Sequence, residues 1–155
     1  MASLISISSM IIGSVGIFFG FYFISSDLSL AVKLVTLSTV GIVGTLAFVR
    51  HVIFHKDDAK RLGWETDRPD WMFEVGFANL AFGIIGIISV LFWETTSQAL
   101  VLIGYSVYLF QAAILHGYRY FTDEVKVPAR LWRSTILSLV YVGMMIYFAV
   151  ASLSY

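Results

Sequence analysis

The residues best suited to chemistry are three histidines and one glutamate. His51 and His55 are four positions apart, so on a continuous helix both imidazoles would project to the same side. Glu74 opens one apolar segment and His116 lies near the end of another, both at the depth of the histidine pair. Imidazole and carboxylate groups bind zinc and iron, and histidines from facing helices can ligate a haem iron. The pattern predicts a metal or haem site formed by these four residues.

A second polar group lies about one helical turn deeper, where polar side chains usually face a bundle interior. It consists of Asn79, Tyr105, Tyr108 and Gln111. These residues could support the metal ligands or line a pore. Each residue also has a purely structural interpretation. Asn79 and Gln111 could form hydrogen bonds between helices, and Glu74 could complement the positive end of its helix dipole. His116 could simply end its helix, and the histidine pair could lie at the boundary with water.

Several other chemistries have no residues to support them. The chain contains no cysteine, which excludes disulfides, thiolate catalysis and iron–sulfur clusters. It has no metalloprotease, phosphate-loop, dinucleotide or serine-elbow motif. Tyr105, Tyr108 and His116 could transfer protons in a lipid-modifying enzyme, but no nucleophile accompanies them, and an enzyme is not favoured. The net charge is zero, so nucleic acid is not an expected partner.

The composition places all these residues in a membrane protein. Hydrophobic residues make up 59% of the chain and charged residues 13%, against about 45–50% and about 25% in soluble domains. The mean hydropathy is +0.86. A chain of 155 residues is too small to bury so much apolar surface in its own core. The lipid bilayer is therefore the expected partner.

The predicted fold is all-α: one transmembrane domain over residues 1–155, a polytopic helical bundle. About 20 apolar residues cross a bilayer core, and five segments are long enough, at approximately residues 4–24, 30–54, 73–93, 99–120 and 134–154. They are continuously apolar, which is typical of helices and not of barrel strands. The first segment follows Met1-Ala2-Ser3, which has no basic residue, so a retained helix is predicted rather than a signal peptide.

Basic residues predict the orientation. With five spans, one side holds Arg50, Lys56, Lys60, Arg61, Arg68, Arg119, Lys126, Arg130 and Arg133, and the other side holds only Lys33. Cytoplasmic loops are enriched in such residues, which places the N-terminus in the cytoplasm and the C-terminus outside the cell membrane. Arg50 is expected on the helix face opposite the histidines, with its guanidinium reaching the lipid headgroups.

Small residues predict which faces pack together. Gly76, Asn79, Gly83 and Gly86 share one face of the third helix, and such stripes let backbones approach closely. They indicate a compact bundle and favour a homo-oligomer, so a pore or permeation subunit and a structural or accessory subunit are both alternatives to a metal protein. The segment 57–64 is predicted to form a short surface helix, capped by an aspartate and closed by Gly63.

The region from Phe48 to Leu80 resembles a family of small prokaryotic multi-pass membrane proteins that is classed as a domain of unknown function. The resembling residues are Arg50-His51-x-x-Phe54-His55, Ala59, Gly63-Trp64 and Phe73-Glu74-x-Gly76-x-Ala78-Asn79-Leu80. The chain departs from the pattern at Arg68-Pro69-Asp70-Trp71-Met72. The resemblance implies no activity, but it suggests that the histidine–glutamate segment is the distinctive part of the family.

Overall fold

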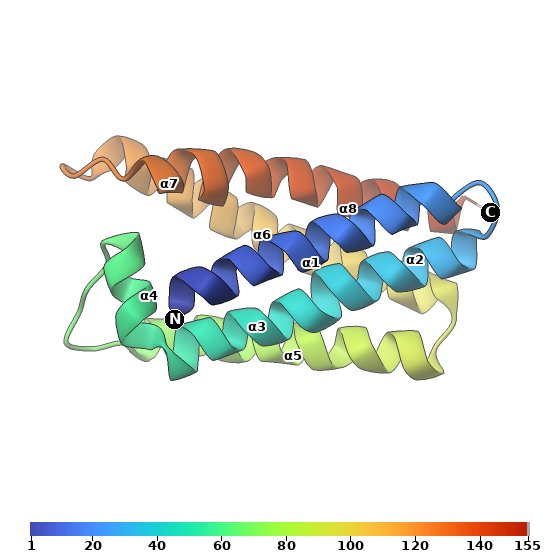
Figure 1. The fold of residues 1–155 in the computed structure, drawn as a ribbon, viewed down its shortest axis with the longest axis horizontal. Helices are drawn as coiled ribbons and strands as arrows, with labels where there is room; N and C mark the ends of the chain where they lie inside the picture. The colour runs from blue at the N-terminus through green and yellow to red at the C-terminus, as the bar shows by residue number, and fades with distance from the viewer. Residues whose placement is uncertain (155) are drawn as a thin grey trace.

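The protein is a bundle of long helices in the computed structural model, which describes residues 1–154 apart from the side chain of Ala129 (Figure 1). In chain order the elements are α1 (Ala2–Phe23), α2 (Leu28–Thr36), η1 (Leu37–Ile42), α3 (Val43–Phe48), η2 (Val49–Ile53), α4 (His55–Leu62), α5 (Asp70–Phe92), α6 (Thr95–Thr122), α7 (Pro128–Leu131), η3 (Trp132–Leu137) and α8 (Ser138–Leu153). The η elements are π-helical turns inside longer helices. No strand occurs between residues 1 and 154, so the all-α prediction is confirmed.

Five helical segments are long and apolar enough to cross a membrane, as the sequence predicts. They are Ala2–Phe23, Leu28–Ile53, Asp70–Phe92, Thr95–Thr122 and Trp132–Leu153. The fourth is longer than expected, because α6 has 28 residues. At 1.5 Å per residue it measures about 42 Å, which exceeds the roughly 30 Å of a bilayer core. Part of α6 must therefore tilt or extend beyond the hydrocarbon.

The second span is the central one. Half of its most apolar stretch is buried, against 22% to 28% in the other four. It packs against α1, α5, α6 and α8. Its two π-helical turns, η1 and η2, hold more residues per turn than an α-helix, so they rotate the faces of the residues that follow.

The second and third spans meet through glycines. A Cβ atom on Gly83 would lie 2.9 Å from the backbone nitrogen of Thr45, and one on Gly86 would lie 2.9 Å from that of Gly41. On α5 the structure buries Gly76, Asn79, Gly83 and Gly86, so the predicted stripe does face the bundle. Close backbone packing of this kind holds helices together where the surrounding lipid provides little hydrophobic drive.

One loop joins the second span to the third, and another joins the fourth span to the fifth. Both loops lie at the same end of the bundle as the N-terminus, and the C-terminus lies at the opposite end (Figure 1). The terminal ammonium of Met1 is 2.7 Å from Oδ2 of Asp57 on α4. Arg130 of α7 donates hydrogen bonds to the carbonyl of Leu62 at the end of α4. These contacts join three chain segments into one end of the molecule, which is called the α4–α7 end below.

Candidate functional site

The paired histidines make separate contacts. The helix breaks at Phe54, so His51 belongs to η2 and His55 begins α4. Their expected i, i+4 relation applies only within one continuous helix. His51 Nδ1 lies 2.8 Å from Oδ2 of Asp58, whereas His55 donates from Nδ1 to the carbonyl of Val52 at 3.0 Å.

Glu74 and Gln111 are both exposed, which corrects their expected inward orientation. Glu74 was predicted to join the site because it lies at the same membrane depth as the histidines. It lies about 200° around α5 from the buried Gly76, so it is on another face of the helix. Gln111 belongs to a polar face of α6 that is too wide to be buried completely. That helix buries the side containing Ser106, Ala113 and Gly117 instead.

The third histidine packs against an aromatic ring. The His116 ring stacks on the Trp64 indole, with 4.8 Å between centroids and 3° between planes. Its Nδ1 is buried without a hydrogen-bond partner among residues 1–154. In this part of the chain, no three or more His, Asp or Glu side chains are grouped as a metal site requires. The structure does not bring the predicted ligands together, and metal or haem binding stays a prediction.

The deeper polar residues form a hydrogen-bonded link between α5 and α6. Tyr105 donates to Oδ1 of Asn79 at 3.0 Å, and Nδ2 of Asn79 donates to Tyr108 at 2.7 Å and to the carbonyl of Val75 at 2.8 Å. Tyr105 is buried, as is Asn79. Both ends of the Asn79 amide are therefore bonded, which fits interhelical adhesion better than a water-filled pore.

The most concentrated charge in the described chain surrounds Asp58, which is completely buried on α4. Oδ1 of Asp58 accepts from Nε of Arg61 at 2.8 Å and lies 2.7 Å from its Nη2. Oδ2 lies 2.8 Å from His51 Nδ1 and 3.4 Å from Nε of Arg50. Arg50 also donates from Nη2 to His51 Nε2 at 3.1 Å. An arginine can only donate, so Nε2 of His51 accepts in this contact and is occupied by Arg50.

The partners of Asp58 decide its ionisation. Burial alone would raise the pKa of this carboxyl group, but the contact with His51 and the charges of Arg50 and Arg61 outweigh it and lower the pKa to about 2. Asp58 is therefore a carboxylate throughout the physiological pH range.

Arg50 does not reach outward to the headgroups as predicted. Its side chain is only 19% exposed and is directed at Asp58. The physical reason is the π-helical geometry of η1 and η2, because an assumed rotation of 100° per residue no longer holds after a π-helical turn. The same turns that separate the histidines bring Arg50 inside.

A third arginine, from the fifth span, completes the site. Arg133 lies close enough to Arg61, Asp58 and Arg50 for their charges to act on it. Arg50, Arg61 and Arg133 are called the arginine cluster below. With His51 neutral, Arg50 and Arg61 contact the single carboxylate and Arg133 adds a third positive charge nearby, so the site carries an excess positive charge of about two.

A fourth arginine is neutralised separately. Arg130 is buried, forms an ion pair with Asp123, and donates to the carbonyls of Leu62 and Gly63 at the end of α4. Gly63 closes α4 with φ 65°, as predicted, in a conformation that favours glycine. Arg130 also lies over the Trp64 ring, at 5.4 Å from its centroid. Arg130 thus fixes α4 against α7 but adds no free charge to the site.

Asp58 has no predicted role in the sequence beyond a possible helix cap. In the structure the N-cap of α4 is Phe54, which makes no side-chain cap. One spacing did carry information: Asp58 lies three positions before Arg61 within α4, a separation that places helical residues on one side. The contribution of Arg133 has no signal in its local sequence, because it comes from a distant span.

The fold and this site define a polytopic bundle of membrane-length helices with a buried, cation-rich cluster at one end. Residues 3–154 match a family described as a family of unknown function, DUF6790, and the chain belongs to that family. The predicted resemblance to an uncharacterised family is thereby confirmed. No curated protein matches the chain, and no solved structure matches it either.

Proposed function

We propose that this protein binds an anionic group, the phosphate of a membrane lipid, at the arginine cluster on the cytoplasmic side of the cell membrane. The observation that supports the proposal is the imbalance of charge around Asp58. Arg50 of η2 and Arg61 of α4 contact one buried carboxylate, and Arg133 of η3 adds a third positive charge nearby. An additional anion would neutralise the remaining positive charge.

Uncompensated charge at a partly buried site is unfavourable, because each ion loses hydration without a partner. The side chains of Arg50 and Arg61 are 19% and 13% exposed, so each retains a small part at the surface of the molecule. Guanidinium groups match phosphate oxygens in geometry and can donate two hydrogen bonds at once. These properties favour phosphate over a simple halide.

The location of the cluster supports a lipid source. Arg50 is near the end of the second span, and Arg133 is near the start of the fifth. Both positions correspond to the level of lipid headgroups. The cytoplasmic leaflet of a cell membrane is rich in anionic lipids, and the excess of lysine and arginine at the α4–α7 end supports a cytoplasmic location for this end.

The test compares lipids added to the purified full-length protein in detergent. Phosphatidylglycerol should raise the melting temperature more than phosphatidylcholine, and the difference should shrink in Arg133→Gln. Lys60→Gln is the matched control, because Lys60 is an exposed cation at the same end and outside the cluster. Inorganic phosphate serves as the soluble probe: a shift equal to that of the lipid would assign a free anion as ligand. If Arg133→Gln and Lys60→Gln respond to phosphatidylglycerol like the wild type, the proposal is wrong.

A further inference from the structure

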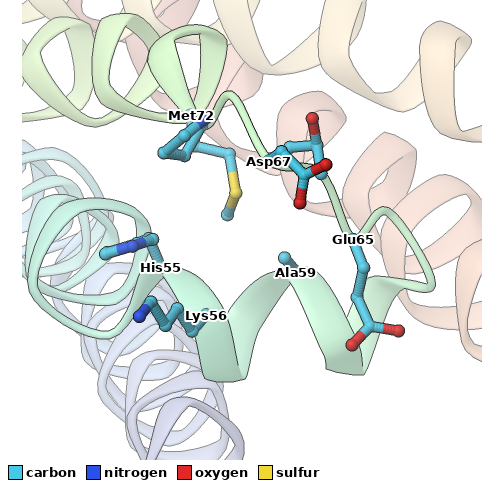
Figure 2. A pocket seen from close by; sticks show the side chains of 8 residues that line it. His55, Lys56, Ala59, Glu65, Asp67 and Met72 are labelled. Carbon is cyan, nitrogen blue, oxygen red and sulfur yellow. The ribbon is translucent and has the colours of Figure 1, made fainter.

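A separate hollow opens between α4, the loop after it and the first turn of α5, with a volume of about 690 Å³ (Figure 2). That volume lies within the usual range of ligand pockets, about 300–1,000 Å³. Its apolar lining includes Ala59 and Met72, both of which are buried residues. None of its lining residues belongs to the arginine cluster.

The charged groups of the hollow are divided between its two ends. Figure 2 shows His55 and Lys56 at one end, and Glu65 and Asp67 at the other. Within residues 1–154, Lys56, Glu65 and Asp67 form no ion pair. His55 uses Nδ1 for the carbonyl of Val52, which leaves Nε2 for a ligand. The hollow therefore offers a positive end and a negative end that the protein itself does not connect.

We infer that this hollow binds a phosphoethanolamine group, with the phosphate beside Lys56 and the ammonium beside Asp67 and Glu65. A zwitterion complements both ends at once, whereas a simple anion or cation would be repelled by one of them. A primary ammonium donates hydrogen bonds to carboxylates. A choline group cannot donate, and its usual recognition is an aromatic cage, which the lining residues do not supply.

The position of the hollow indicates that the group belongs to a lipid. Asp70 begins α5, which is one of the membrane-length helices, and Met72 lies in its first turn. A headgroup at this level would have its acyl chains beside the apolar surface of α5. Phosphatidylethanolamine supplies the required zwitterion at the required depth.

The experiment measures the binding of phosphatidylethanolamine and phosphatidylcholine to the full-length protein by native mass spectrometry. We expect an affinity preference of about tenfold for phosphatidylethanolamine, the value of one charge-assisted hydrogen bond at a partly hydrated site. Asp67→Asn should remove this preference, and Lys56→Gln should weaken the binding of both lipids. Glu124→Gln is the control, because Glu124 is an exposed carboxylate at the same end but outside the hollow.

A competition arm distinguishes the two sources of the ligand. Free phosphoethanolamine that binds as tightly as the lipid would assign a soluble zwitterion to the hollow, and weaker binding would assign the lipid. Equal affinity for the two lipids in the wild type would overturn the inference. The same conclusion would follow if the preference persisted in a Glu65→Gln, Asp67→Asn double variant. Neither result would affect the arginine cluster, whose test uses other residues and another lipid.

Discussion

Replacing Asp58 by asparagine should be the most informative single change in this protein. The substitution keeps the size of the side chain but removes the one carboxylate that, within residues 1–154, pairs with Arg50 and Arg61. Both arginines are mostly buried, so water cannot fully replace the lost partner. We therefore expect Asp58→Asn to destabilise the fold at neutral pH.

The expected magnitude follows from the burial of the site. Removing one partner of a buried ion pair costs about 3–5 kcal/mol, because the other charge stays buried without compensation. Arg50 and Arg61 retain 19% and 13% exposure of their side chains, which favours the lower limit. A loss of about 3 kcal/mol corresponds to roughly a hundredfold increase in the unfolding equilibrium constant.

The assay is unfolding of the purified protein by SDS in mixed micelles, monitored by tryptophan fluorescence. Asp57→Asn is the matched control, because Asp57 is the preceding residue of α4 but is exposed and pairs with the terminal ammonium of Met1. Exposed pairs contribute little, so the control should behave almost like the wild type. A change below about 1 kcal/mol for Asp58→Asn would refute the idea that this carboxylate stabilises buried arginines.

The other predictions concern pH, packing and topology. The pKa of Asp58 is lowered to about 2 from its ordinary value of 3.8. The stabilisation that its carboxylate provides is therefore complete above pH 4–5 and is lost towards pH 2, a difference of about 2 kcal/mol. Asp58→Asn should not show this loss in the same assay, and an identical acid response of both proteins would contradict the prediction. Gly83→Leu should disrupt the bundle, since even a Cβ there meets the backbone of Thr45 at 2.9 Å, and an unchanged melting temperature and gel-filtration volume would disprove the inward stripe. Asn79→Leu should lower the melting temperature by breaking the α5–α6 hydrogen bonds, and it would be a neutral change if those bonds were dispensable. Near Glu65, only a reporter that requires the cytoplasm should be active, and at the C-terminus only a reporter that requires export should be active. The reverse pattern would overturn the predicted orientation.

The sequence alone determined the class of this protein and the path of its chain. Its apolar segments had to be helices in lipid, because a membrane-spanning backbone must satisfy its hydrogen bonds within the segment. The glycines of the third span predicted its packing face correctly, since an α-helix without interruption keeps its faces in register over its whole length. The end of α4 at Gly63 could also be predicted locally, because a helix often ends at a glycine that adopts the left-handed backbone conformation.

The site was decided by tertiary structure. Two π-helical turns in the second span and the break at Phe54 changed the directions of Arg50, His51 and His55, and a rule based on regular rotation could not foresee this. Asp58 became the centre of the site because α4 folds back against η2. Arg133 joined it from a span about seventy residues away in the chain. Local spacing determines which residues share a helix face, but only the packing of different helices determines which charges share one buried environment.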